Sequence, residues 1–95
     1  MRAYELVLVI NPDLPDENIQ ATIDKVTGFV TEKGGTIATV DLWGRRKLAY
    51  PIKRFTLGHY VLTQFSLDPK LTVEIERNLL LSEDVLRHLL VRLED

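Results

Sequence analysis

The chain has 95 residues, 45% of them hydrophobic and 27% charged, which is typical of one globular domain and not of a disordered segment. It contains no cysteine, which excludes disulfide bonds, thiolate metal ligands and a cysteine nucleophile. A net charge of −2 excludes a uniformly basic surface, although cations can still gather in one place.

The first predicted element is a strand. Residues Tyr4 to Ile10 are apolar on both alternating faces and rich in β-branched and aromatic types, which indicates a strand in the middle of a sheet. Asn11 and Pro12 end it. The run is too short to cross a bilayer and has no cleavage pattern after it, so we expect mature structure and no membrane segment.

A helix follows the first strand. The residues Asp13 to Asp16 offer capping acids around Pro15, and Gly34 and Gly35 supply a left-handed stop after Lys33. Between them, apolar residues recur at helical spacing at Ile19, Ile23, Val26 and Val30.

The middle of the chain predicts a long hairpin. A second strand begins near Thr36 and runs past Gly44 towards Tyr50, where Pro51 limits it or places it on a sheet edge. A third strand covers 57–67, and the two are joined by the basic segment around residues 53 and 54.

The last two elements are a helix and a strand. Asp68 and Pro69 are a cap and a first helical residue, and Leu71, Ile75 and Leu79 continue an apolar helical stripe. Residues 85–93 have ambiguous periodicity, but their short length favours a closing strand.

The predicted order βαββαβ indicates an α+β fold of the ferredoxin-like, split βαβ type. Short right-handed connections turn this order into a four-stranded antiparallel sheet with two helices on one face. We expect one such domain over residues 1–95, with the other sheet face open to RNA or to a protein partner.

Charge is distributed unevenly along the chain. No acidic residue occurs in the stretch 42–67, which contains five cations interleaved with aromatic residues. Guanidinium and ammonium groups pair with phosphates, and aromatic rings stack on unpaired bases, so the segment suits RNA. A solvated hairpin with its aromatics turned into the core is an equally open interpretation.

No catalytic or metal-binding pattern is present in the sequence. His59 and His88 lie on separate predicted strands without a neighbouring nucleophile, and we expect both to be surface or partner-facing residues. The Gly34-Gly35 pair follows a helix and lacks the GK[ST] ending of a phosphate-binding loop. We therefore expect no catalytic residues, no metal, no cofactor and no small-molecule substrate.

Residues 44–52, with the sequence GRRKLAYPI, resemble the signature of the bacterial ribosomal protein six family of the small subunit. The opening MRAYE, the Asn11-Pro12 pair and the VLR at 85–87 also match the layout of that family. The resemblance implies a cytoplasmic, ribosome-associated protein that binds small-subunit ribosomal RNA together with ribosomal protein eighteen, without catalysis. Some members carry an extended acidic tail after the last strand, which we expect this chain to lack, so no tail-dependent contact or modification is carried over from the resemblance.

The resemblance also implies a set of basic and aromatic contact residues, shared between RNA and the protein partner, with the last one the weakest candidate. They are Arg2, Arg45, Arg46, Lys47, Tyr50, Lys53, Arg54 and Arg87. The resemblance assigns Gly44 to backbone conformation, and Leu48 and Ile52 to packing.

Three rival functions share this fold order. An RNA-recognition motif of the splicing type needs a basic residue and an aromatic spacing that residues 57–65 lack. An acylphosphatase-like enzyme needs a glycine-rich cradle with a positioned Arg and Asn, which is missing. A ferredoxin-like regulatory module that binds a small molecule stays open as the alternative function.

Overall fold

The computed structural model describes residues 1–93 and contains four strands and two α-helices in the predicted order. A 3₁₀ turn over Pro69–Leu71 precedes the second helix. The elements are β1 (Arg2–Ile10), α1 (Asp16–Glu32), β2 (Thr36–Ile52), β3 (Phe55–Leu67), α2 (Thr72–Leu81) and β4 (Val85–Arg92).

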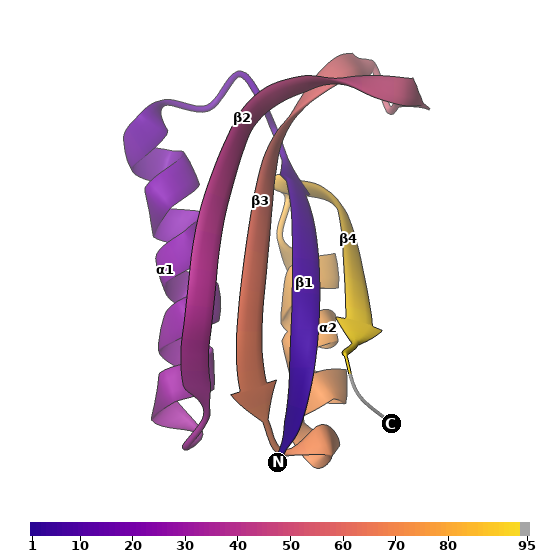
Figure 1. Cartoon of the computed structure of the whole chain (residues 1–95). Coiled ribbons are helices and arrows are strands. Elements are labelled where there is room, and N and C mark those ends of the chain that lie inside the picture. The colour runs from indigo at the N-terminus through magenta and orange to yellow at the C-terminus, as the bar shows by residue number, and fades with distance from the viewer. Residues whose placement is uncertain (94–95) are drawn as a thin grey trace.

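The four strands form one antiparallel sheet in the order β2-β3-β1-β4. β1 lies between β3 and β4, as its apolar character on both faces predicts, and Leu8 stands opposite Val61 on one side and His88 on the other. Both helices lie behind the sheet in Figure 1, and the face towards the viewer is not covered by a helix. The predicted ferredoxin-like α+β fold is therefore confirmed.

The core lies between the sheet and the two helices. Alternate residues of β1 and β3 point into it, because the side-chain period of a strand is two. The apolar stripe of α1 and two residues of α2 cover them. The apolar core residues from these four elements are Tyr4, Leu6, Leu8, Ile10, Val61, Phe65, Leu67, Ile19, Ile23, Val26, Val30, Ile75 and Leu79.

The ends of α1 differ in part from the prediction. Its N-cap is Pro15, which makes no side-chain capping hydrogen bond, so the expected capping acids do not cap it. Asp16 and Glu17 lie instead in the first helical turn, where their charges interact favourably with the helix dipole. At the other end, Gly34 has a φ of 85°, which confirms the left-handed stop.

The start of the second helix also differs from a simple α-helix. The Asp68 side chain accepts a hydrogen bond of 3.0 Å from the backbone N–H of Lys70, so the predicted cap is present. The first turn after it is 3₁₀, and the α-helix begins only at Thr72. No helix within residues 1–93 is long and apolar enough to span a membrane.

The strands of the hairpin are longer than predicted. β2 continues through Pro51 to Ile52, and β3 begins at Phe55, leaving a two-residue turn of Lys53 and Arg54. Proline is tolerated inside β2 because β2 is an edge strand. Figure 1 shows β2 and β3 extending beyond the rest of the sheet and bending over towards the side of β4.

Candidate nucleic-acid interface

The part of the hairpin that extends beyond the sheet, residues 45–57, is here named the basic arm. Its five cations are all exposed, and within residues 1–93 none of them forms an ion pair with a carboxylate. They are Arg45, Arg46, Lys47, Lys53 and Arg54. Unpaired cations that reach solvent are available to the phosphates of a polyanion.

A bulge in β2 sets the direction of the arm. The register of β2 against β3 shifts between Leu42 and Gly44, and Gly44 has a φ of 78°, a conformation that glycine adopts without strain. The carbonyl of Trp43 accepts a hydrogen bond of 3.3 Å from Nε of Arg46. The assignment of Gly44 to backbone conformation agrees with this geometry.

An apolar contact joins the base of the arm to the sheet. Leu48 is 7% exposed, and Gly58 on β3 lies so close to β1 that an added Cβ would stand 2.4 Å from Cγ1 of Val9 and 3.2 Å from Cδ2 of Leu48. Because this approach is possible only without a side chain at Gly58, the arm is packed against the sheet and not free in solution.

The far part of the arm is joined to β4. Arg87 donates a hydrogen bond from Nη1 to the Tyr50 hydroxyl, and its guanidinium carbon lies 5.8 Å from the centroid of the Tyr50 ring. In the turn, the guanidinium of Arg54 lies 5.2 Å from the ring centroid of Phe55. These contacts hold aromatic and cationic groups together at one end of the molecule.

A family model described as ribosomal protein S6 matches residues 3–92. This chain belongs to the ribosomal protein S6 family.

Individual members of the ribosomal protein S6 family match over the full chain. It is 43% identical over 95 residues to the small ribosomal subunit protein bS6 of Moorella thermoacetica, covering 100% of this chain and 97% of that protein. It is 41% identical to the bS6 of Caldanaerobacter subterraneus, covering 100% of both. The fold is similar to the crystal structure of 30S ribosomal protein S6 from Thermotoga maritima, with a TM-score of 0.90 and 30% identity, covering 96% of this chain and 86% of that one.

Membership of the ribosomal protein S6 family makes this chain a component of the small ribosomal subunit, associated with ribosomes in the bacterial cytoplasm. It is a structural protein and not an enzyme. The predicted family is confirmed, and the alternative of a small-molecule regulatory module is set aside by the match.

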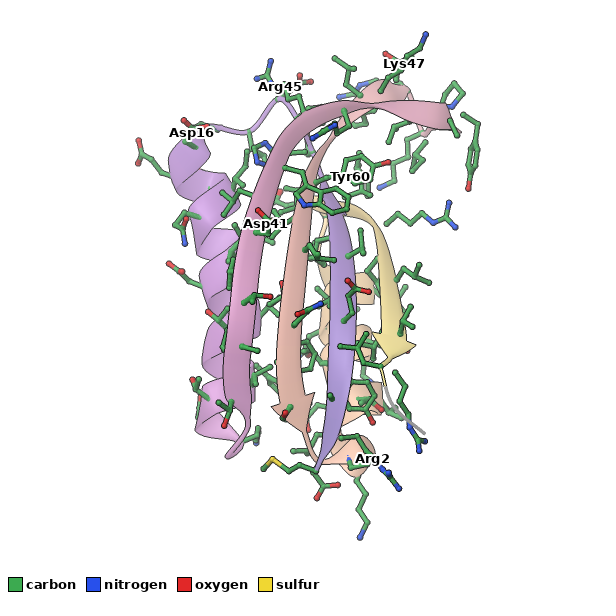
Figure 2. The ribbon with its side chains drawn as sticks, viewed as in Figure 1. Arg2, Asp16, Asp41, Arg45, Lys47 and Tyr60 are labelled. Carbon is green, nitrogen blue, oxygen red and sulfur yellow. The ribbon has the colours of Figure 1, made fainter. Side chains whose placement is uncertain are left out.

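The predicted contact residues of this family member do not all lie together. Seven gather at the arm end of the molecule, since Tyr50 and Arg87 join the five arm cations. Arg2 lies at the opposite end of the sheet, where it stands opposite Leu67, and Figure 2 shows it far from Arg45 and Lys47. One compact ligand on the arm cannot also contact Arg2.

The two histidines are less exposed than predicted. His59 is half-buried on the helix-facing side of β3, and its Nε2 atom is buried without a hydrogen-bond partner in the described part of the chain. Nε2 of His88 lies 3.9 Å from a carboxylate oxygen of Glu76 on α2. Within residues 1–93, no group of three or more His, Cys, Asp or Glu side chains could hold a metal.

Two aromatic residues of the open sheet face, Trp43 and Tyr60, are not among the predicted contact residues. Trp43, 42% exposed, stacks on Tyr60 with ring centroids 6.3 Å apart and planes 12° from parallel. Tyr60 belongs to β3, and Figure 2 shows it in front of the sheet, near Asp41. Because side chains alternate between the two faces of a strand, Tyr60 lies on the opposite face from the buried Val61. This alternation is the sequence signal that could have identified Tyr60 as a residue of the open face.

Apolar side chains continue along the open face. Val7 of β1 stands between Leu62 of β3 and Leu89 of β4 in one row across the sheet. Leu89 is 54% exposed and Val91 is 40% exposed. An apolar surface of this kind on a sheet without helices is typical of a contact with another macromolecule.

Proposed function

We propose that this chain binds small-subunit ribosomal RNA through its basic arm, together with ribosomal protein eighteen of the small subunit. In this proposal residues 1–95 act as one ferredoxin-like ribosomal-protein domain. The observation that carries it is the exposure of the five arm cations without carboxylate partners in residues 1–93. A protein with a net charge of −2 can still bind a polyanion at the basic arm, because the local electrostatic potential, and not the net charge, governs that contact.

The mechanism is positional. Arg45, Arg46 and Lys47 follow one another on β2, so exposed cations lie on both faces of the arm and can contact more than one phosphate. Lys53 and Arg54 extend the positive surface to the turn. Because Leu48 and Tyr50 hold the arm against the sheet, RNA meets cations that are already in place.

The remaining predicted contacts have different positions in this proposal. Arg87 and Tyr50 hold each other, and both are exposed at the arm end, where they can face RNA or the protein partner. Arg2 serves a second contact at the far end of the sheet. The half-apolar open face, with Leu89 and Val91 exposed, supports a protein partner beside the RNA.

The salt dependence of binding tests the role of the arm. If the arm contacts about three to five phosphates, the affinity for small-subunit ribosomal RNA falls with salt by a log-log slope of about two to four. We expect a triple alanine variant of Arg45, Arg46 and Lys47 to bind more weakly and to reduce this slope by about two. Filter binding with ribosomal protein eighteen present, at several salt concentrations, measures both quantities.

A matched control removes the same charge elsewhere. Lys25 on α1, Lys33 at the C-cap of α1 and Arg77 on α2 are exposed and lie away from the arm. Their triple alanine variant is expected to bind ribosomal RNA with the affinity and slope of the original protein. An equal loss in both triple variants, or none in either, would remove the arm from the mechanism.

A further inference from the structure

A small hollow lies on the open face of the sheet, next to the base of the basic arm. It has a volume of about 170 Å³, and its walls include Tyr60 of β3 and Arg87 and Leu89 of β4, with Val7 and Val9 of β1 between them. Tyr60, Val9 and Arg87 stand opposite one another in a single row across three strands. The hollow therefore has an apolar floor, an aromatic wall and a cationic wall.

The spacing of the two walls suits one flat ring. The backbones of β3 and β4 that carry Tyr60 and Arg87 are two strand spacings apart, or about 9–10 Å. A ring stacked between two planar groups needs about 7–8 Å, twice the usual contact distance between carbon atoms. The volume is well below the roughly 300–1,000 Å³ of pockets for drug-sized ligands, so the hollow fits one base and not a larger cofactor.

The aromatic wall is held in place before any ligand arrives. Trp43 stacks on Tyr60, and Nε1 of Trp43 donates a hydrogen bond of 3.0 Å to a carboxylate oxygen of Asp41. The ring of Tyr60 is half-buried and supported on one side by the indole. Ordering such a wall on binding costs little side-chain entropy, because the rings are already fixed.

The cationic wall is held in a similar way by the arm. The Tyr50 hydroxyl accepts a hydrogen bond from Arg87, a lining residue of the hollow, and this bond restrains the Arg87 side chain. No aspartate or glutamate lines the hollow. Tyr60 also stands opposite Gly44 on β2, and Gly44 directly precedes Arg45, the first cation of the arm. The phosphates attached to a base in the hollow would therefore lie near positive charge.

We propose that this hollow receives one unpaired base of small-subunit ribosomal RNA, stacked on the ring of Tyr60 and faced by the guanidinium of Arg87. The inference rests on the proposed function and names a second kind of contact within it. Arm cations neutralise phosphates, whereas the hollow takes the flat face of a base. Stacking releases no counterion, so the two contacts differ in their response to salt.

The decisive experiment compares Tyr60→Leu, which keeps an apolar side chain, with Tyr60→Phe, which keeps the ring. We expect Tyr60→Leu to raise the Kd for small-subunit ribosomal RNA by between about 5- and 150-fold, as for the loss of one stacked base, without changing the salt slope. Tyr60→Phe is expected to stay within about twofold. Ultraviolet crosslinking of the original protein to the RNA is expected to join a base to the peptide that contains Tyr60.

Three outcomes would overturn the base site. An unchanged Kd for Tyr60→Leu, with the triple arm variant still weakened, would remove the hollow and leave the proposed function standing. If Tyr60→Leu weakened binding to ribosomal protein eighteen, measured without RNA, by the same factor as binding to RNA, the hollow would be assigned to that protein. Absence of a crosslink at Tyr60 and Trp43 would exclude the base even if Tyr60→Leu failed to fold. Failure of the original protein to bind ribosomal RNA with its partner present would instead refute the proposed function itself.

Discussion

Arg87 of β4 donates a hydrogen bond to the hydroxyl of Tyr50 on β2, across 37 positions of sequence. β2 and β4 are the two edge strands of the sheet, so this contact passes around its end. It exists because the basic arm bends over towards β4, as Figure 1 shows. A straight hairpin would leave both side chains in solvent.

The Tyr50–Arg87 contact is expected to show energetic coupling. In a double-mutant cycle with Tyr50→Leu and Arg87→Gln, the coupling free energy of unfolding is expected to be about 0.5–1 kcal/mol, as for an exposed cation–π pair. Urea denaturation of the four proteins measures it. Additive single effects would mean that the arm is not joined to β4 in solution.

Gly58 is expected to tolerate no side chain. In Gly58→Ala, the new methyl group would lie 2.4 Å from Cγ1 of the stiff, buried Val9 side chain. We expect a loss of about 1–3 kcal/mol in the free energy of unfolding. Gly28→Ala is the matched control, because nothing lies within 4 Å of its added Cβ on α1, and it should gain about 0.5–1 kcal/mol. Similar values for the two variants would contradict the close approach of β3 to β1 and the arm.

The turn of the arm carries backbone strain at Lys53. Its φ of 57° lies in the left-handed region, which disfavours a residue with a Cβ by about 1–2 kcal/mol. Lys53→Gly is therefore expected to raise the free energy of unfolding by up to about 1 kcal/mol, measured by denaturation in urea. Arg54→Gly removes the same charge at a residue without positive φ, and we expect no gain in its free energy of unfolding. A gain in both variants would point to charge repulsion as the cause.

Leu8 is expected to be among the most sensitive core positions. It is fully buried on the central strand, and Leu8→Ala should lower the free energy of unfolding by about 2–5 kcal/mol. The same change at Leu81, 76% exposed on α2, should stay within about 0.5 kcal/mol. Thermal and urea denaturation of both variants check this, and a small effect at Leu8 would place the core elsewhere.

Much of the fold could be predicted because its signals are local. The stripe from Ile19 to Val30 repeats at helical spacing and forms the buried face of α1, and the glycine after Lys33 ends that helix with the expected left-handed φ. The predicted N-cap of α1 was wrong, because acidic residues near a helix start indicate that a cap is present but do not identify the residue at the N-cap position. Residues 94 and 95, which follow the predicted closing strand, lie outside the described part of the chain.

The candidate site was predicted only in part. The run of cations in the arm is a property of composition and is visible in the chain itself, whereas the half-burial of His59 depends on α1 packing beside it. Trp43 and Tyr60 are 17 positions apart and meet only because a bulge between Leu42 and Gly44 shifts the register of β2. Arg2 was grouped with the arm although the length of β1 places it at the other end of the sheet.

The sequence by itself determined the element order, the family signature over residues 44–52 and the stretch without acids, since each is a property of neighbouring residues. Only the tertiary structure decided that the arm bends, that Tyr50 meets Arg87, and that Tyr60, Val9 and Arg87 form one row. These contacts join residues far apart in the chain and depend on strand register and twist, in which a shift of one residue moves a side chain to the opposite face.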